Sequence, residues 1–217
     1  MSKDKTNSFD DTFLNSVVKL LDLDHKIEKI PVTSEDAALL KKSVTGRFPV
    51  LEQSSGLAVC EVLPISRVLS KQHPLFYGVD ENHRGQVDMW TDYINSTVVP
   101  AAQRVLAQCD GTAKVQMDVK NFSIALTELK NALANLENHL KLRFYLVGHS
   151  LTLADVFLVS VLAQAFTLAI DKKTRDAQFP NLSRYATLSL QTPVLSQTFG
   201  QITFCKDSAF KGTTTSA

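Results

Sequence analysis

The sequence has little cysteine, and its cysteines are not arranged as a metal or redox motif. Cys60, Cys109 and Cys205 are widely spaced among 217 residues, and no CxxC pair occurs. An odd, scattered set of this kind argues against a disulfide framework and against a zinc site. We therefore expect no bound metal and a reducing compartment, the cytoplasm.

The chain also lacks an excess of charge of either sign. Lys and Arg number 23 and Asp and Glu number 22, which gives a formal net charge of +1. Without a large positive field the protein cannot hold a polyanion by counterion release, so any contact with nucleic acid has to be local. The first residues, MSKDKTNSFDDTF, contain no apolar central run, so we expect no secretory signal.

Apolar residues make up 44% of the chain, an ordinary share for a globular protein. Their pattern in the first third of the chain gives both helix and strand signals. After a polar segment at 1–10, which we expect to be flexible, FLNSVVKLLDL has helical spacing behind Asp11. HKIEKIPV is typical of a short strand or an extended linker. Ser34 is then predicted to cap a second helix.

A β-hairpin and a boundary follow. Residues 48–52 and 57–61 have β character and flank the turn-forming residues QSSG, which predicts an antiparallel pair. LPISRVLSKQ then has the pattern of a helix. Pro74, Gly78 and the polar stretch DENHRGQ mark the expected boundary between two regions, because strand signals end there.

Beyond this boundary the signals are helical. The predicted helices are QVDMWTDYINSTVVPAAQRVL, 119–140, 153–170, FPNLSRYATLSL and TPVLSQTF. Pro100 is expected to kink or break the first of them. The expected fold is therefore α+β and mostly helical, with an α/β region at 11–75, an all-helical region at 82–205 and a tail or linker at 206–217.

The segment 153–170 is apolar almost all round. A membrane span of about 20 residues is the alternative, but Asp155, Ser160 and Gln164 lie inside it and no anchor residues flank it. A central helix covered by its neighbours explains the pattern better.

A His, a Ser and an Asp stand close together at the start of this segment. A nucleophilic triad would need Ser150 on a strained turn between glycines, and no GxSxG surrounds it; His149 is expected in a loop. Thr152 and Asp155 instead have the spacing of a capping box. We therefore expect them to start a helix, and Asp155→Ala to cost about 1–2 kcal/mol of stability.

Several segments resemble a known family. FYLVGHSLTLADVFL resembles a helix start in the C-terminal domain of glutathione transferases, and GRFPVLE with LAVCE resembles the β-hairpin of their thioredoxin-like N-terminal domain. WTDYINSTVVPAAQRVL and FPNLSRYATLSLQTPVLSQTFGQITFCKD are similar to transferase-like domains of the translation apparatus, which include elongation factor 1 gamma and scaffolds of the aminoacyl-tRNA synthetase complex. The resemblance implies a glutathione transferase-like fold with a degenerate thioredoxin-like region and an all-α C-terminal domain.

The resemblance places a vestigial glutathione site at Pro49 and Glu61. Pro49 would be the family's cis-proline, and Glu61 would sit where the family holds the γ-glutamyl end of glutathione. However, Val62 follows Glu61 where the family has Ser, and Ser8 is the only hydroxyl near an N-terminus without an apolar first strand. A thiolate at neutral pH needs a fixed donor beside it, so we expect no cofactor, no catalytic residue and no enzyme activity. A glutathione-dependent transferase with a rebuilt site is the alternative.

The resemblance also implies pairing with other transferase-like domains through the helix at 182–190. Arg184 matches an arginine that stacks across that interface, and Tyr185 lies beside it in sequence; a guanidinium can stack and form two hydrogen bonds at once. A solvated surface arginine explains Arg184 equally well. A second family surface would pair two such domains, including two copies of this chain. Its apolar candidates, which could equally be core residues, are Leu39, Leu40 and Val59.

A short basic string, Lys172, Lys173 and Arg175, could contact tRNA phosphate, although three charges on a near-neutral chain are more often solvated. This alternative would make the chain a tRNA-handling cofactor domain of a longer protein. The function we expect first is a non-catalytic module that assembles a translation complex. Its expected partners are synthetases, elongation-factor subunits or scaffold proteins.

Overall fold

The structure, a computed structural model, describes residues 9–28, 41–46, 48–110 and 119–210. The helices of the first half are α1 (Phe9–Leu20), α3 (Val62–Ser70), α4 (Pro74–Tyr77), α5 (Glu81–Tyr93), the π-helix η1 (Ile94–Val98) and α6 (Val99–Asp110). Those of the second half are α7 (Val119–His139), the short 3-10 helix η2 (Leu140–Leu142), α8 (Leu153–Leu168), α9 (Lys172–Gln178), α10 (Pro180–Leu190) and α11 (Pro193–Phe199). The strands are β1 (Val50–Glu52) and β2 (Ala58–Cys60).

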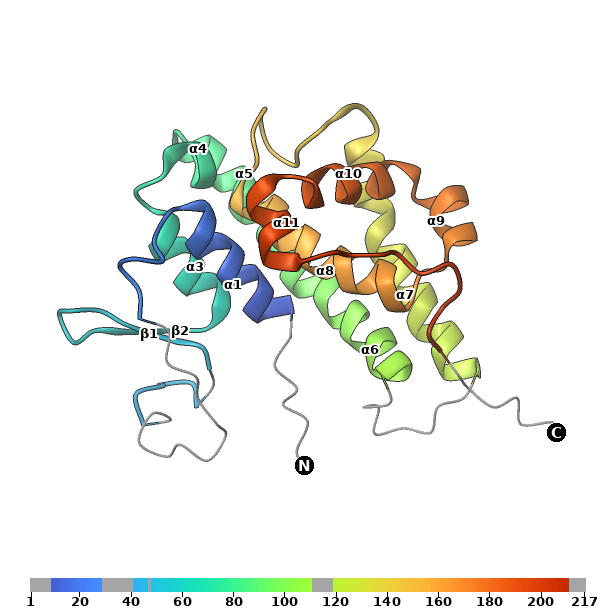
Figure 1. Ribbon diagram of the computed structural model, residues 1–217, viewed down its shortest axis with the longest axis horizontal. Helices are drawn as coiled ribbons and strands as arrows, with labels where there is room; N and C mark the ends of the chain where they lie inside the picture. Colours follow the sequence, from blue (N-terminus) through green and yellow to red (C-terminus); the bar gives the residue numbers. More distant parts are fainter. Residues whose placement is uncertain (1–8, 29–40, 47, 111–118, 211–217) are drawn as a thin grey trace.

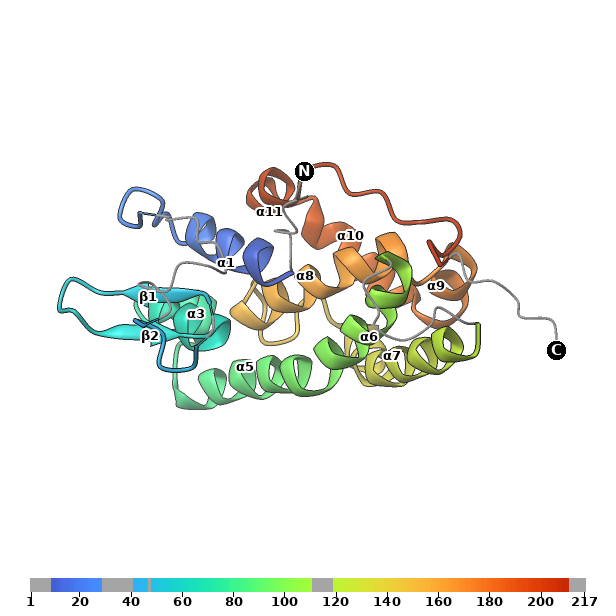
Figure 2. The same ribbon diagram turned by 90° about the horizontal axis from the view of Figure 1, so that it is seen from below.

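The helices pack around α8. In Figure 1 the hairpin, α1 and α3 lie at one end of the molecule and the later helices at the other. Figure 2 shows α8 as a middle layer between α5, α6 and α7 on one side and α1, α10 and α11 on the other. Helix α8 contacts α1, α5, α6 and α10, so it is covered from both layers.

The predicted hairpin is confirmed. Strands β1 and β2 are antiparallel, with Leu51 opposite Val59. Gln53 and Leu57 close the turn through a backbone hydrogen bond of 2.9 Å, and Gly56 supplies the positive φ of 82° that the turn requires. Within the described ranges the sheet consists of these two strands.

The strand predicted at HKIEKIPV is absent from its described part, and other predictions for the first third cannot be compared with the structure. The described part of HKIEKIPV, residues 25–28, is turn and irregular backbone rather than strand. Residues 29–32, residues 34–40 of the helix predicted behind Ser34, and residues 1–8 of the segment 1–10 that was expected to be flexible lie outside the described residues. Residues 9–10 of that segment are helical, as the start of α1. Helix α1 begins at Phe9, two residues before the predicted cap at Asp11.

Pro100 does not break the helical run, and the DENHRGQ stretch opens a helix. Pro100 lacks an N–H, but η1 widens the turn just before it, so that the Val99 N–H bonds to the carbonyl of Ile94 and the helix continues into α6. The polar stretch is not a loop but the first turns of α5. Its N-cap is Asp80, whose carboxylate accepts the His83 N–H at 2.7 Å.

The prediction of a buried central helix at 153–170 is confirmed by α8. All but a few of its residues are buried, including Ser160, whose hydroxyl donates to the carbonyl of Val156 at 2.8 Å. None of the described helices is both long and apolar enough to cross a bilayer. The absence of a polar face on α8 is therefore explained by neighbours rather than by lipid.

One apolar core joins the first and second halves of the chain. Phe13 of α1 packs its ring against Phe157 of α8, with centroids 4.8 Å apart, and Leu63 and Phe76 belong to the same buried cluster. Helix α1 also contacts α11. A division into folding units at 11–75 and 82–205 therefore stays a proposal, because no break in the core separates the two.

The carboxylate of Asp155 organises the start of α8. It closes a capping box with Thr152, accepting the Thr152 N–H at 2.8 Å and its hydroxyl at 2.6 Å. Its other oxygen accepts the Leu146 N–H and the Tyr185 hydroxyl, both at 2.8 Å. Burial raises the pKa of the Asp155 carboxyl, and the hydrogen bonds from Thr152, Leu146 and Tyr185 oppose that rise. One side chain thus joins the loop before α8, the helix itself and α10.

Replacing Asp155 by Ala is expected to lower the free energy of unfolding by about 3 kcal/mol, more than a helix cap alone would lose. The reason is that the Leu146 N–H, the Thr152 N–H and the Tyr185 hydroxyl would be left buried without an acceptor. Urea denaturation followed by circular dichroism measures the difference.

Asp176→Ala is the matched control. Its carboxylate pairs with Lys172 on the exposed side of α9, so its loss should cost less than about 1 kcal/mol. Equal losses for the two variants would contradict the role given to Asp155.

Candidate functional site

The region that resembles a glutathione site lies between the hairpin and α3. The peptide bond between Phe48 and Pro49 is cis, as the family resemblance implies, and the Glu61 N–H donates to the Pro49 carbonyl at 3.2 Å. Glu61 precedes α3 with φ 70° and ψ 146°, a conformation that non-glycine residues rarely adopt. Its side chain makes no capping hydrogen bond to the helix.

This region carries negative charge. Asp10, in the first turn of α1, is half-buried. Burial raises the pKa of the Asp10 carboxyl, and repulsion from the Asp11 and Glu61 carboxylates raises it further. The N-terminal end of α1 and the residue before α3 therefore bring carboxyl groups close to one another.

The groups that would activate a thiol are not supplied by the described part of this region. Val62 replaces the family hydroxyl and packs its apolar side chain against the core. Ser8, the hydroxyl considered from the sequence, lies outside the described residues. No cluster of His, Cys, Asp and Glu with the makings of a metal site occurs in the described ranges.

The second candidate site lies around α10. Arg184 is half-buried, and its guanidinium donates to the carbonyls of Leu140 at 2.8 Å and Arg143 at 3.0 Å. The same group lies over the ring of Phe144, 5.3 Å from its centroid. Arg184 therefore holds the loop after η2 through one of its terminal nitrogens, and its role at a partner interface stays a proposal.

The expectation that Tyr185 contacts a partner was wrong. Its side chain is 1% exposed and its hydroxyl donates to Asp155, so it belongs to the core of the protein. Burial raises the pKa of the Tyr185 hydroxyl well above its ordinary value, and repulsion from the Asp155 carboxylate raises it further. This hydroxyl acts as a neutral donor that fixes α10.

Sequence reasoning missed Glu137, which also fixes α10. Its buried carboxylate accepts the backbone N–H groups of Asn181 at 3.0 Å and Leu182 at 2.8 Å, and the Asn181 side-chain amide at 2.6 Å. A signal for this existed, because Phe179 stands at the N-cap position and cannot cap the helix itself. The sequence did not show which residue would supply the acceptor.

A groove runs beside α10. Its lining includes Leu142, Arg143, Phe144, His149, Leu188 and Thr192, and its cavity measures about 460 Å³. We call it the α10 groove. Leu142 is 89% exposed, Phe144 69% and Leu188 47%, which is unusual for apolar side chains gathered around one hollow.

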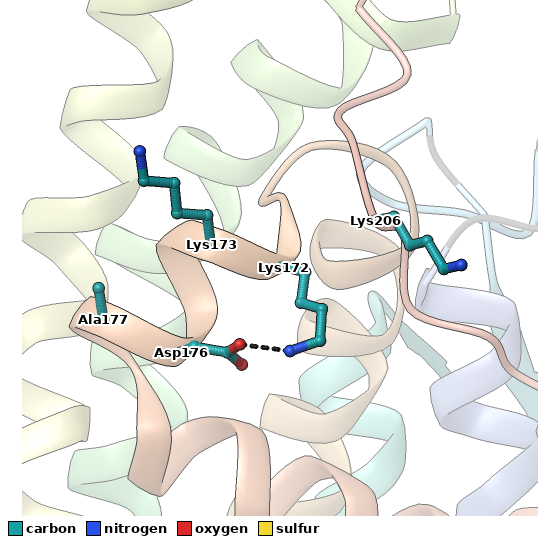
Figure 3. A pocket seen from close by; sticks show the side chains of 5 residues that line it. All are labelled: Lys172, Lys173, Asp176, Ala177 and Lys206. Atoms are coloured by element: carbon teal, nitrogen blue, oxygen red, sulfur yellow. Dashed lines mark hydrogen bonds and ion pairs between the residues drawn. The ribbon is translucent and has the colours of Figure 1, made fainter.

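The basic string at the start of α9 is only partly a surface feature. Figure 3 shows Lys172, Lys173 and Lys206 around an open hollow of about 580 Å³, with Lys172 paired to Asp176. Arg175 is neither solvated nor available to tRNA phosphate, the two alternatives considered for it, because its side chain is 6% exposed.

Arg175 instead fastens the C-terminal segment 200–210 to the helices. Its guanidinium donates to the Phe166 carbonyl at 3.2 Å and the Cys205 carbonyl at 2.7 Å, and lies over the ring of Phe204 at 5.4 Å from the centroid. Further along, the ring of Phe210 stacks on Phe122 with centroids 4.2 Å apart. Residues 206–210, predicted as part of a tail, are thus attached to the body.

The remaining sequence candidates do not form a site. Ser150 donates to the carbonyl of Leu75 at 3.4 Å and His149 is exposed, while the Asp155 carboxylate is occupied by the donors described above, so the three do not act as a triad. Val59 is half-buried on β2. Leu39 and Leu40 lie outside the described residues.

Two family models match the chain. The model for "Glutathione S-transferase, C-terminal domain" matches residues 92–191, and that for "Glutathione S-transferase, N-terminal domain" matches residues 15–81. Together these ranges make up most of the chain. The chain belongs to the glutathione S-transferase family. The expected family and fold class are therefore confirmed.

Relatives of this glutathione S-transferase-like chain carry the name elongation factor 1-gamma. The protein of Rattus norvegicus is 27% identical over 177 residues, which are 82% of this chain and 39% of that protein. Probable elongation factor 1-gamma 1 of Arabidopsis thaliana is 30% identical over 173 residues, which are 79% of this chain and 41% of that protein. The chain thus spans about two fifths of the length of these curated relatives.

Solved glutathione S-transferase-like structures share the fold. The GST-like domain of elongation factor 1-gamma from Saccharomyces cerevisiae superposes with a TM-score of 0.78 at 20% identity, covering 96% of both chains. Glutathione transferase URE2P6 from Phanerochaete chrysosporium, solved with oxidized glutathione, gives a TM-score of 0.78 at 18% identity, covering 89% of this chain and 91% of that one. The elongation factor 1-gamma domain and the glutathione transferase therefore both share the fold of this chain.

Asp10→Asn is expected to raise the free energy of unfolding at neutral pH. The raised pKa means that the folded state favours the protonated Asp10 carboxyl. This proton therefore stabilises the fold at low pH, and the stabilisation is lost as the pH rises through the pKa of Asp10 in the folded protein. The gain from Asn should vanish below the ordinary carboxyl pKa of 3.8, where Asp10 is protonated in both states, and grow as pH rises.

Urea denaturation between pH 3 and pH 8 measures this dependence, with the exposed Asp207→Asn as control. A gain that is constant with pH, or that appears equally in the control, would contradict the buried, repelled state of the Asp10 carboxyl.

Proposed function

We propose that the protein is a non-catalytic glutathione S-transferase-like module that assembles a complex of the translation apparatus. The observation that carries the first part is the acidic character of the vestigial site, where burial and repulsion from Asp11 and Glu61 raise the pKa of the Asp10 carboxyl. The names of the relatives support the second part.

The chemistry of thiol conjugation argues for the absence of catalysis. A glutathione thiol is ionised at neutral pH only beside a donor or a positive charge, and clustered carboxylates favour the neutral thiol instead. At the expected γ-glutamyl end, Val62 follows Glu61 and offers no hydroxyl to a bound peptide.

A working surface replaces the reaction centre in this proposal. The α10 groove exposes Leu142, Phe144 and Leu188, and Arg184 fixes the loop that presents them. Interface anchors are typically large apolar or aromatic residues held in place before the partner arrives. We propose the cytoplasm as the compartment and other transferase-like domains, elongation-factor subunits or synthetases as the partners.

The purified protein is expected not to conjugate glutathione to chlorodinitrobenzene and not to be retained on glutathione resin. Absorbance of the conjugate and the eluted fraction measure these two properties. The Glu61→Ala variant is the control for contaminating enzymes, since a contaminant would be unaffected by it. Turnover by the natural sequence that falls in Glu61→Ala would overturn the proposal in favour of a glutathione-dependent transferase.

Arg184→Ala is expected to weaken the partner complex about tenfold, equivalent to about 1.4 kcal/mol, because the loop carrying Phe144 loses its fixed position. Arg104→Ala is the matched control, an exposed arginine of α6 paired with Glu128.

Quantitative affinity purification from cells, with translation proteins counted by mass spectrometry, compares the two variants with the natural sequence. Unchanged recovery of the partners with Arg184→Ala would exclude α10 as the assembly surface. Recovery of tRNA without partner proteins would favour the tRNA-handling alternative.

A further inference from the structure

The α10 groove combines exposed apolar side chains with a hollow that can receive others. Leu142 is the last residue of η2, Phe144 stands on the loop that follows, and Leu188 lines the same hollow from α10. The cavity of about 460 Å³ lies between these two elements. A groove of this shape is suited to inserted side chains, and it differs from a flat or protruding patch in that respect.

The walls of the groove are held in place by bonds between distant segments. Arg184 ties α10 to the carbonyls of Leu140 and Arg143, and Glu137 caps the start of α10. Tyr185 ties the same helix to Asp155. A partner therefore meets an ordered surface and loses little free energy to loop ordering on binding.

The two segments that line the groove carry no acidic side chain. Neither residues 138–154 nor residues 177–206 contain Asp or Glu, although the chain as a whole is nearly neutral. Lys141, Arg143 and His149 are exposed in the loop. The surface is therefore complementary to a segment that carries both acidic and apolar side chains.

We propose that the α10 groove binds an acidic amphipathic helix of the partner protein. The apolar face of that helix inserts between Leu142, Phe144 and Leu188, and its acidic flank pairs with Lys141 and Arg143. A helix presents apolar residues at spacings of three and four with charges beside them, which matches a groove that has apolar walls and a basic rim. This inference rests on the proposed function and names the chemistry of the partner.

Other occupants fit the groove less well. A second copy of the chain in a symmetric pair would place the basic rim of one copy against that of the other, without acids to neutralise it. Nucleic acid would place phosphates against the exposed Leu142 and Leu188. An anionic membrane could pair with the basic rim, but a bilayer surface cannot fill a recessed cavity.

The test selects helical peptides from a display library whose surface positions are randomised. The unmodified protein is the bait, and a counter-selection removes peptides that also bind the Leu142→Ser, Leu188→Ser double variant of the protein. We expect selected peptides to carry Asp or Glu beside Leu or Phe at helical spacing. Their Kd should rise at least tenfold with Leu142→Ser and with Arg143→Glu, measured by fluorescence anisotropy.

Ile124→Ser is the matched control, since Ile124 is 50% exposed on α7, away from the groove, and should leave Kd unchanged. Leu142 is 89% exposed, so its substitution should leave the unfolding midpoint unchanged, which is checked in urea.

Several outcomes would overturn the inference. The selected peptides could be basic, or they could bind the double variant as tightly as the natural sequence. Sedimentation could show a dimer that Leu142→Ser dissociates. The protein could bind phosphatidylserine vesicles and lose that binding with Leu142→Ser. A native partner complex that forms and survives Arg143→Glu would overturn this inference while leaving the proposed function intact. Glutathione conjugation would overturn the proposed function instead.

Discussion

The buried carboxylate of Asp155 is the interaction on which the arrangement of the helices depends. It accepts hydrogen bonds from the loop at Leu146, from the cap at Thr152 and from Tyr185 on α10. A charged group in a dry interior is tolerated only when its oxygens are satisfied, so these donors have to be placed correctly for the protein to fold. The same bonds that begin α8 therefore also set the position of α10 and of the groove beside it.

The fold of the family is retained in this chain, and we propose that its chemistry is not. The cis peptide bond before Pro49, the positive φ at Glu61 and the packing of α1 on α8 belong to the path of the backbone and to the core. Close to them, burial and the neighbouring Asp11 and Glu61 raise the pKa of the Asp10 carboxyl. A fold can persist when a reaction centre changes, because packing determines the core while a reaction centre depends on a few polar groups. Surfaces such as the α10 groove can then carry the function.

Local patterns in the sequence predicted most of the elements. The helix at 119–140, the buried helix at 153–170, the hairpin and the Thr152 capping box follow from the spacing of apolar residues and from caps within a few positions. The family was found from motifs of the same kind. What could not be predicted depends on partners far along the chain. Arg175 meets Cys205 thirty residues away, Glu137 caps a helix that begins more than forty residues later, and Arg184 reaches back by a similar separation. The π-helix η1 before Pro100 is another feature that the local pattern does not predict.

The C-terminal segment has a geometric consequence for the whole molecule. Arg175 and the stacked rings of Phe122 and Phe210 lead the chain along the helices to the far end of α7, at the edge of Figure 1 opposite the loop that follows η2. No residue of the described C-terminal segment, 200–210, lines the α10 groove. The segment therefore covers the helices without closing the groove, which stays open to a partner.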